Sequence, residues 1–450
     1  MTLPFARCCL RAIVAAFLKV SIVASLSVVA RTAYAGALDT TFGTGGKVTV
    51  DFPFGSQPTY DSYGYYTFVQ PSGRIVGVGA HRQQGGKGMA NGVGMTGLTS
   101  SGALDSGFVG FGRAIEWEDI SSIGLSDAQM LSDGRFLRLS TIFRIFGPSP
   151  TAVLRRFNAD GTTDASFSPN LSVDQSQPVT GKFAVLRNGK ILVAIQSRAS
   201  NRYYLVKLNA DGSRDTTFGA GGVKEIPRIN PVAINDWFIG MQELPNGKIL
   251  IAGLIGFSSA SLDHNELFLL RLDSNGNADH SFGRLGLVRR TFDGRRIRAF
   301  DLIVQSENKY LITGAIKNPD EDALMVRFTQ RGRPDYAFGN AGMVITDFNV
   351  DGIDGFRRAE LSIDGKIIVA GYAASSSDPF TSFLVARYSA NGIPEAHTRT
   401  AFTPAQNSVA TDVAIQPDGK ITVIGYTKNP NPSINGNVFA FARYTAITND

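Results

Sequence analysis

The chain repeats one short segment, Gly-x-x-Asp-x-x-Phe, along most of its length. Regular self-similarity at a period of tens of residues is typical of architectures in which every repeat is one structural unit. The pattern therefore constrains the shape of the protein more than its chemistry. The Asp and Phe positions of this corner are Asp39 and Phe42, Asp105 and Phe108, Asp164 and Phe167, Asp215 and Phe218, Asp279 and Phe282, and Asp335 and Phe338, with a degraded seventh copy at Gly392, Glu395 and Thr398.

A turn followed by an apolar run recurs out of phase with the corner, at intervals of 54 to 61 residues. Most copies contain Asn-Gly or Asp-Gly, which tolerate the positive φ of a type I′ turn and indicate a β-hairpin. The run after the turn is apolar at consecutive positions, as in 249–252, which predicts a strand covered on both faces. The turns are centred on Gly73, Gly134, Gly189, Gly247, Asn308, Gly365 and Gly419.

Each unit also contains an apolar strand before the corner and a short Gly-rich strand after it, which makes four strands and no amphipathic helix. Four-stranded units repeated around an axis are the blades of a β-propeller. The chain finishes on a third strand, and its repeats begin with a corner and a fourth strand. We therefore predict an all-β, seven-bladed β-propeller with four strands per blade. Its last blade should be closed by pairing of 45–52 with 437–444, which protects two sheet edges.

These motifs resemble the delta-60 repeat family, bacterial proteins with tandem units of the form DGKIlvaG…flvaRynadGslDttFGtgG. The matching segments include 209–222, which reads NADGSRDTTFGAGG, and 416–421, which reads QPDGKI, and the resemblance covers essentially all of 36–450. It implies a propeller-like β fold and, for most members, export from the cytoplasm. It implies no established activity and therefore no catalytic residues. The corner at 392–398 departs from the family pattern.

Residues 1–35 have the pattern of a secretory signal peptide. Arg7, Arg11 and Lys19 accompany an apolar stretch, and Ala33-Tyr34-Ala35 is an A-x-A cleavage site beside the first corner. A membrane anchor is the alternative, but Lys19 leaves the apolar stretch too short to span a bilayer. We expect a signal peptide at 1–35, a single propeller domain at 36–450, no transmembrane segment in the mature chain, and a location outside the cytoplasm, whether secreted, periplasmic or on the cell surface.

Removal of the leader changes what the composition implies. It removes both cysteines, Cys8 and Cys9, so that the mature chain has no disulfide, thiolate metal site or cysteine nucleophile. It also removes four of the 44 basic residues and no acidic ones, so the formal net charge falls from +6 to +2. Nucleic-acid binding then has no support from overall charge. We predict a monomer that uses no cofactor.

Two patterns could indicate a metal or catalytic site. The corners at 209–215 and 273–279 place oxygen-bearing side chains at alternate positions, as calcium loops do. A glycine at the fourth position and the absence of a bidentate Glu favour instead a turn whose Asp and Asn side chains accept backbone N–H groups. The histidines form no recognisable motif, so a histidine metal site or triad would require the fold to gather them. They are His81, His264, His280 and His397.

Two local clusters could form a binding surface. The aromatic one could bind sugars or a protein, although alternate residues of it fit the first strand of a blade better. The basic one could bind an acidic partner, although scattered charge on a solvated loop is the simpler interpretation. The aromatic cluster is Tyr60, Tyr63, Tyr65, Tyr66 and Phe68, and the basic cluster is Arg284, Arg289, Arg290, Arg295, Arg296 and Arg298.

Two classes of function remain. We favour an exported, non-enzymatic β-propeller scaffold that binds a protein or glycan partner through loops on one ring face. The alternative is a hydrolase or lyase with its site at the mouth of the central channel, because propellers host both classes. An enzyme should show polar residues that interrupt the innermost apolar strands, and only Arg138 and Thr313 clearly do so. Catalytic and binding residues remain unassigned, and converging histidines or carboxylates at the channel mouth would favour the enzyme.

A column of opposite charges accompanies the corners. In five units a basic residue stands eight positions before the corner acid, and Arg443 and Asp39 fill the two columns at the chain ends. We predict structural pairs that hold each corner to its third strand. Gly97 occupies the basic position before Asp105, so backbone N–H groups should satisfy that acid. The five pairs are Arg156 and Asp164, Lys207 and Asp215, Arg271 and Asp279, Arg327 and Asp335, and Arg387 and Glu395.

Overall fold

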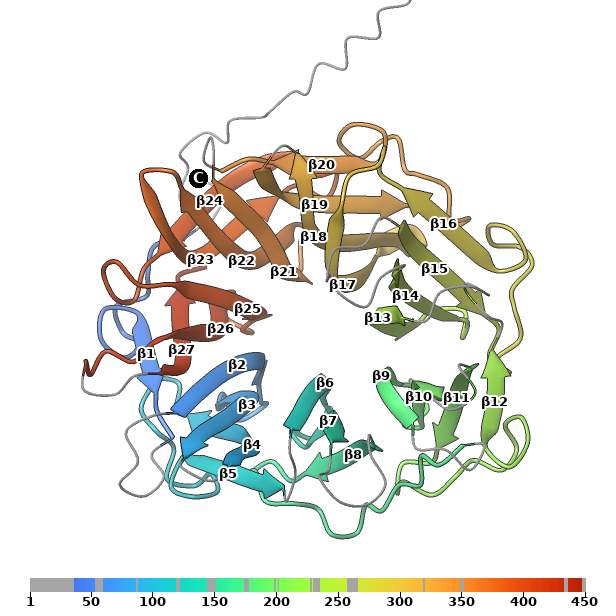
Figure 1. Cartoon of the computed structure of the whole chain (residues 1–450), viewed down its shortest axis with the longest axis horizontal. Helices are drawn as coiled ribbons and strands as arrows, with labels where there is room; N and C mark the ends of the chain where they lie inside the picture. Colours follow the sequence, from blue (N-terminus) through green and yellow to red (C-terminus); the bar gives the residue numbers. More distant parts are fainter. Residues whose placement is uncertain are drawn as a thin grey trace, which may run out of the picture.

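The strands form antiparallel sheets arranged around a central axis in the computed structural model of the chain (Figure 1). Apart from a short 3-10 turn at Ser306–Asn308, the elements of the described part of the chain are β-strands, which confirms the predicted all-β class. The structure describes residues 36–52, 60–85, 88–118, 122–143, 151–173, 178–197, 200, 202–226, 229, 235–256, 266–318, 320–348, 352–432 and 436–446. The expected signal peptide at 1–35 lies outside these residues.

Four of the sheets follow the chain strand by strand, each strand pairing with the next. Within these sheets the first strand lies nearest the axis and the last lies farthest from it (Figure 1). They consist of β2 (Tyr60–Val69), β3 (Ile75–Gly85), β4 (Gly88–Leu98) and β5 (Arg113–Glu118); β6 (Ser122–Met130), β7 (Phe136–Phe143) and β8 (Thr151–Phe157); β9 (Pro178–Val185), β10 (Ile191–Ser197), β11 (Arg202–Leu208) and β12 (Val223–Ile226); and β13 (Asn235–Glu243), β14 (Ile249–Gly256), β15 (Glu266–Leu272) and β16 (Leu287–Thr291).

An eight-stranded sheet comes next along the chain, and it consists of two four-stranded halves. A single parallel pair, Glu321 with Ile353, joins the halves. The first half is β17 (Ile297–Gln305), β18 (Lys309–Asn318), β19 (Asp320–Phe328) and β20 (Met343–Thr346), and the second half is β21 (Ile353–Leu361), β22 (Ile367–Ser375), β23 (Asp378–Tyr388) and β24 (Pro394–Thr400). In β24 the degraded corner continues directly into a strand.

The two ends of the described chain share one sheet. β1 (Lys47–Val50) pairs antiparallel with β27 (Asn437–Tyr444), from Lys47 opposite Ala442 to Val50 opposite Phe439. β26 (Ile421–Lys428) and β25 (Ser408–Ile415) complete this sheet toward the axis. The predicted pairing of 45–52 with 437–444 is therefore confirmed over four residues of the N-terminal segment.

The hairpins form where the sequence predicts them, but their turns are not type I′. In each Asn-Gly or Asp-Gly pair at these turns only the glycine has a positive φ, as in a three-residue loop that ends in a left-handed glycine. Gly247 has a φ of 75°, and Asn308, which replaces the glycine in one unit, has a φ of 53°. The strands that follow the turns are buried on both faces, as predicted. Gly253 shows why one column of these strands favours glycine: a Cβ atom there would lie 2.4 Å from both the Phe268 ring and the Trp237 carbonyl oxygen.

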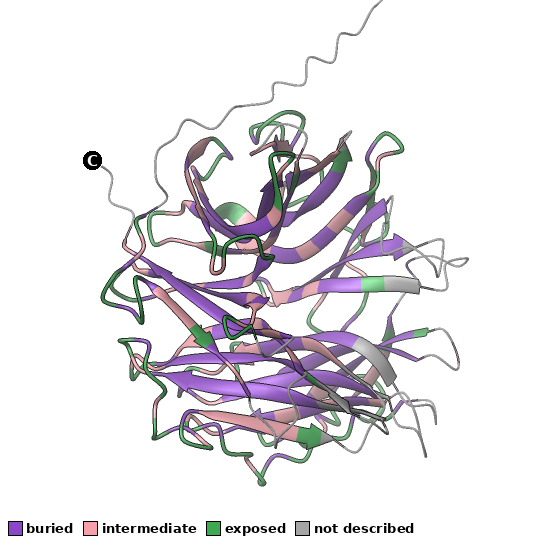
Figure 2. Ribbon diagram, turned by 60° about the vertical axis from the view of Figure 1, so that its left-hand side comes forward, coloured by how far each residue is buried: buried purple, intermediate pink, exposed green. Residues whose placement is uncertain are grey.

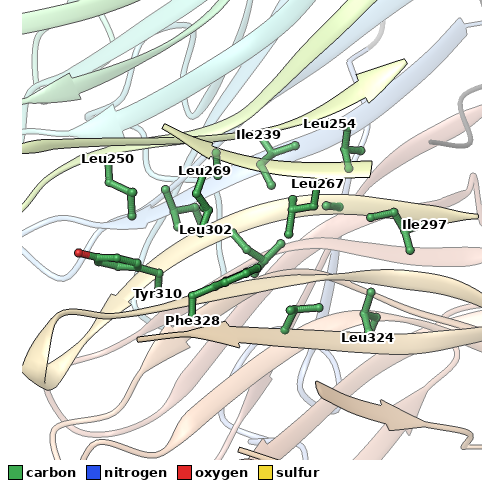
Figure 3. Packing of buried hydrophobic residues seen from close by; sticks show 14 of the residues in the cluster. Ile239, Leu250, Leu254, Leu267, Leu269, Ile297, Leu302, Tyr310, Leu324 and Phe328 are labelled. Atoms are coloured by element: carbon green, nitrogen blue, oxygen red, sulfur yellow. The ribbon is translucent and has the colours of Figure 1, made fainter. Parts of the chain in front are cut away.

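Hydrophobic clusters fill the space between neighbouring sheets. Figure 3 shows one of them, in which Leu250 and Leu269 face Leu302 and Tyr310 of the next sheet. The described residues form seven such clusters, each joining consecutive sheets, and one joins Phe42 and the chain-end sheet to β3. Figure 2 shows the result: buried residues run along the strands, and exposed residues gather at the turns. Stability therefore depends on every sheet being covered by its neighbours.

The predicted ion pairs at the corners are confirmed. Arg271 is a buried example. Its Nε atom lies 2.6 Å from Asp279, and its guanidinium stacks 4.4 Å from the Phe282 ring centroid. Its Nη1 atom donates to the Gln330 carbonyl of the next sheet. One basic side chain thus holds acid, corner aromatic and neighbouring sheet together. The other distances are 2.8 Å for Arg156–Asp164, Arg327–Asp335 and Arg387–Glu395, 2.9 Å for Arg443–Asp39, and 3.9 Å for Lys207–Asp215.

A second basic residue, which the sequence reasoning missed, reaches every corner acid from the turn. Turns and corners lie at the same end of each sheet because one follows the first strand and the other follows the third. Asp105 accordingly binds Arg74 at 2.7 Å as well as the Gly107 N–H, so the prediction that backbone alone satisfies it was wrong. The other pairs are Arg135–Asp164, Lys190–Asp215, Lys248–Asp279, Lys309–Asp335, Lys366–Glu395 and Lys420–Asp39, at 2.8 to 3.7 Å.

Candidate functional site at the axial strands

The strand nearest the axis in each sheet precedes the turn, and this corrects the sequence-based search for polar interruptions. Arg138 and Thr313 lie on the second strands β7 and β18, away from the axis. Arg138 is fully buried, pairs with Glu116 of the neighbouring sheet and lies over the Phe157 ring. Thr313 is also fully buried. Neither residue lines the channel, so neither bears on an axial site. The axial strands are β2, β6, β9, β13, β17, β21 and β25 (Figure 1).

The axial strands carry a column of side chains that the sequence reasoning did not find. It lies seven residues before the turn glycine, or before Asn308 in one unit, and it differs from sheet to sheet. In six of the strands the pairing register shifts next to this position, as at a β-bulge, which re-aims a side chain. We call this set the axial column: Tyr66, Asp127, Lys182, Gly240, Asp301, Arg358 and Asp412.

The three carboxylates of the axial column join neighbouring axial strands. Asp301 accepts the N–H of Leu302 on its own strand at 2.9 Å and the N–H of Ala359 on the next axial strand at 3.0 Å. Asp412 does the same with Val413 at 2.9 Å and with Thr67 at 2.8 Å, which connects β25 to β2. Asp127 bonds to Ala128 and Phe183 in the same way. Both oxygens of each carboxylate are therefore engaged by backbone donors.

The two cations of the column neutralise these carboxylates. Arg358 lies 3.4 Å from Asp301 and 3.2 Å from Asp412, and Lys182 donates to the Ser126 carbonyl at 2.7 Å and lies 3.9 Å from Asp127. Burial raises the pKa of Asp412 to about 6 and lowers the pKa of Lys182, because both charged forms lose hydration. Although burial opposes the Arg358 charge, the nearby carboxylates raise its pKa.

A polar cavity of about 340 Å³ extends from the axial column toward the turns. Gln129 and Gln242 line it, and their amides donate to the Phe183 and Leu302 carbonyls of neighbouring axial strands. Glu360 stands two residues beyond Arg358 on β21, toward the turn. Water reaches its side chain, yet the surrounding protein limits its hydration and, with the Asp412 charge, raises its pKa to about 7. Glu360 is the axial carboxyl whose protonation changes near neutral pH.

Aromatic rings gather at the other end of the axial strands, on the side of the axial column away from the turns. Tyr63 and Tyr65 of β2 are half-buried and stack with their planes 8° apart and their centroids 6.4 Å apart. Tyr426 of the neighbouring sheet meets Tyr63 edge-on at 4.8 Å. Burial raises the pKa of Tyr65 to about 12, so its hydroxyl stays protonated as a hydrogen-bond donor. These rings present both flat apolar surface and polar tips.

Arg357 extends this aromatic surface to both halves of the eight-stranded sheet. Its guanidinium carbon lies 4.0 Å from the Phe300 ring centroid and 5.3 Å from that of Tyr372. The Arg357 charge also lowers the pKa of the Tyr65 and Tyr426 hydroxyls, although burial raises the pKa of each by more. We call the combined surface the tyrosine–arginine arc: Tyr63, Tyr65, Phe300, Arg357, Tyr372 and Tyr426.

The predicted aromatic cluster therefore divides by strand face. Tyr60 and Tyr66 are buried, the first against His81 and the second with its hydroxyl on the Ser126 carbonyl at 3.0 Å. Phe68 packs against Phe136 of the next sheet. The alternation expected of a first strand is confirmed for β2. Tyr63 and Tyr65 are the members left at the axial surface.

The predicted basic cluster does not form one patch. Arg289 pairs with Glu266, Arg298 pairs with Glu321 at 2.8 Å, and Arg295 donates to the Phe292 carbonyl. Arg290 lies over two phenylalanine rings, and Arg284 is exposed at a corner. Arg289, Arg290, Arg295 and Arg298 contact different partners, so these side chains offer a polyanion no shared surface.

The other residues singled out in the sequence have local roles. His81 is fully buried and bonds to Ser62 at 2.8 Å, and burial lowers its pKa to about 4. His397 contacts Phe348 in the segment between β20 and β21, His280 is exposed at a corner, and His264 lies outside the described residues. In the corners, Asp211 accepts the Ser213 N–H and hydroxyl, and Asp273 accepts two backbone N–H groups. The turn interpretation of the alternating oxygens is confirmed.

Four segments of the chain match a family model described as Domain of unknown function (DUF5122) beta-propeller: residues 132–167, 186–218, 244–282 and 364–394. They include turns and corners of the repeat, and the match supports β-propeller-like repeats in these parts of the chain. The resemblance to the delta-60 family itself stays a prediction. No curated protein matches the sequence. Within the described residues, no helix has the length and apolar character needed to cross a membrane.

Solved structures with a similar fold include three with different descriptions. A protein of unknown function from Dyadobacter fermentans is 11% identical with a TM-score of 0.41, covering 89% of this chain and 100% of its own. A polysaccharide lyase is 10% identical with a TM-score of 0.45, covering 90% and 93%. An ulvan lyase is 10% identical with a TM-score of 0.39, covering 70% and 82%. Likenesses at this level carry no functional assignment.

Proposed function

We propose that the chain is a single seven-bladed, ring-closed β-propeller at 36–450, exported after removal of a signal peptide at 1–35. The seven inter-sheet clusters and the pairing of β1 with β27 support the blade count and the closure. The A-x-A site at 33–35 supports export. N-terminal sequencing of the exported protein should begin at Gly36, and retention of the first 35 residues would contradict the proposal.

The propeller's function in this proposal is non-enzymatic binding of a glycan at the tyrosine–arginine arc. The observation that carries it is the set of half-buried rings of Tyr63, Tyr65 and Tyr426, held on strands of two sheets at one end of the channel. Aromatic rings bind the apolar faces of sugars, and phenol tips bind hydroxyl groups. Rings fixed on strands lose little freedom on binding, which favours recognition.

The axial carboxylates argue against catalysis although they converge on the channel. A general acid or base must exchange a proton with its substrate, whereas Asp127, Asp301 and Asp412 each accept two backbone N–H groups. Each carboxylate instead joins two neighbouring axial strands through these hydrogen bonds. A hydrolase or lyase at the channel mouth remains the second candidate, and one observation favours it: the pKa of Glu360 is raised to about 7.

Glycan binding can be tested on an array of neutral, uronic-acid and sulfated glycans. The purified chain should bind a defined subset, and the double variant Tyr63→Ala/Tyr65→Ala should lose that binding while keeping its melting temperature within a few degrees. Tyr336→Ala is the matched control, because Tyr336 is exposed at a corner at the opposite end of the sheets. Absence of any array binding would contradict the proposal.

The enzymatic alternative needs a separate measurement. Each glycan that binds should be incubated with the chain and examined for shortened or unsaturated products. We expect none. Products that disappear in Glu360→Gln, but persist in the Tyr336→Ala control, would instead establish a hydrolase or lyase.

A further inference from the structure

We infer that the glycan bound at the tyrosine–arginine arc is anionic and that Arg357 binds its carboxylate or sulfate groups. This inference rests on the proposed glycan-binding function and specifies its ligand class. It starts from the position of Arg357, whose guanidinium lies over the Phe300 and Tyr372 rings.

Arg357 lacks the anionic partner that arginines elsewhere in the fold possess. Its Nε atom is buried and has no hydrogen-bond partner among the described residues, and no carboxylate of the described chain forms an ion pair with it. At the corners, by contrast, Nε of Arg327 lies 2.8 Å from Asp335. Stacking on Phe300 and Tyr372 compensates part of the lost hydration but supplies no acceptor for the N–H groups. A bound oxyanion would supply an acceptor to the terminal Nη groups, which are not among the buried atoms, in the bidentate geometry that guanidinium groups favour.

The charges around Arg357 agree with an anionic ligand. Arg82 is exposed beside the arc, where it acts on the Tyr65 hydroxyl together with Arg357. Arg298 is also close, but Glu321 neutralises it at 2.8 Å and accepts the Tyr372 hydroxyl as well. Arg82 lies opposite Asp61 in the pairing of β2 with β3, so the three guanidinium groups of this surface have two carboxylates near them, Glu321 and Asp61. A surface that combines excess positive charge with aromatic rings attracts acidic sugars. Neutral sugars are held by stacking alone and should bind this surface less tightly.

The rings of the arc make a sugar acid more suitable than a free inorganic anion. Tyr63, Tyr65 and Tyr426 extend the surface from Arg357 across two further sheets, farther than a single oxyanion occupies. A chain of sugars could place an acidic group on Arg357 and apolar ring faces on the tyrosines. The inference therefore specifies an oligosaccharide with uronic-acid or sulfate groups.

Two matched pairs of probes test the inference by calorimetry on the full chain. They are an oligogalacturonate with its carboxyl-reduced counterpart, and a sulfated galactan oligosaccharide with its desulfated counterpart. We expect the charged member of at least one pair to bind about tenfold or more tightly than its neutral member. Affinity should fall as salt is added, because salt screens the charges. The pair that shows the difference distinguishes a carboxylate ligand from a sulfate ligand.

Arg357→Gln should abolish the difference within the pair, because glutamine keeps polar bulk but no charge. Arg284→Gln is the control, since Arg284 is an exposed arginine at a corner and away from the arc. Equal binding of both members in both pairs would overturn the inference, and neutral binding would then leave the glycan proposal intact. A difference that survives Arg357→Gln would also overturn it. Failure of all four probes and of the glycan array would overturn both proposals.

Discussion

The corners and the axial column occupy equivalent positions in every repeat, yet they use those positions in opposite ways. At the corners almost every sheet has the same pair, a basic side chain of the third strand on an acid. In the axial column the corresponding residues are a tyrosine, three aspartates, a lysine, a glycine and an arginine. A contact that recurs unchanged maintains the repeat, whereas a position that varies among the copies gives individual sheets different chemistry.

The two regions also treat their carboxylates differently. At the corners, hydrogen bonds from Lys190 and Thr217 hold the pKa of Asp215 at about 2. In the channel, burial raises the pKa of Asp412 to about 6. The first environment stabilises the charged carboxylate, and the second opposes it. The stability that Asp215 contributes is therefore lost as pH falls toward 2, whereas the stability that Asp412 contributes is lost as pH rises through about 6.

The largest effect should come from the corner that joins the chain ends. Asp39→Ala should lower the free energy of unfolding by about 3–5 kcal/mol, because it strands the buried Arg443, and Arg443→Ala should cost somewhat less, because Lys420 still pairs with Asp39 at 3.2 Å. The double variant should cost clearly less than the two single costs together, as measured by chemical denaturation. Additive losses would show that the two residues do not interact. Arg113→Ala removes a more exposed pair with Asp51 and should cost about 0–1 kcal/mol.

Removal of an axial-column aspartate that joins two strands should have the next largest effect. Asp412→Ala leaves the Thr67 and Val413 N–H groups without an acceptor and should cost about 2–4 kcal/mol in the same denaturation assay. Asp301→Ala should cost a similar amount. A loss no greater than that of Asp293→Ala, a control at an almost fully exposed aspartate, would refute the fastening role.

The turn lysines should matter less than the third-strand arginines. Lys190 is about one-third exposed, and Lys207 remains near Asp215 when Lys190 is removed. We therefore expect Lys190→Ala to cost about 0–1 kcal/mol. A melting shift as large as that of Arg443→Ala would mean that the turn, and not the third strand, holds the corner.

The smallest effect should be a change in pH dependence. Because the folded-state pKa of Glu360 is raised from 4.5 to about 7, its contribution to stability is present in acid and is lost as pH rises through this window. Glu360→Gln should flatten the fall in stability between these pH values, although water access to the side chain keeps the change modest. The corner acids act with the opposite sign: the contribution of Asp215 is lost as pH falls from 3.8 toward 2. A Glu360→Gln profile parallel to that of the parent would contradict the assignment.

The sequence predicted the features that repeat and missed those that do not. Turns such as Gly247 and corners such as Asp279 were visible because several copies agree. The partnership of Lys248 with Asp279 was not recognised, although it follows from the fact that turn and corner lie at the same end of an antiparallel sheet. The axial column escaped notice because Lys182 or Arg358 alone looks like an ordinary strand residue. Aligning the units on the turn glycine would have revealed it.

The arc could not have been predicted from spacing alone. Tyr63 and Tyr426 are adjacent only because the last sheet lies beside the first. Arg357 joins them from a third sheet, and nothing in its local sequence distinguishes it from a solvated charge. Its neighbours depend on how the sheets follow one another around the axis, which is a property of tertiary packing.

The shared sheet of β1 and β27 has a consequence for synthesis. Ribosomes extend chains at about 5–20 residues per second, so Lys47–Val50 would wait roughly 20–80 s before its partner is made. During that time the nascent chain cannot finish its last sheet, and Phe42 and Phe52 cannot reach the cluster that buries them. The short strand and its lysine are suited to this delay, because brief, charged edges resist wrong pairing. Maturation of this protein should therefore end with one late, all-or-none event rather than proceed unit by unit.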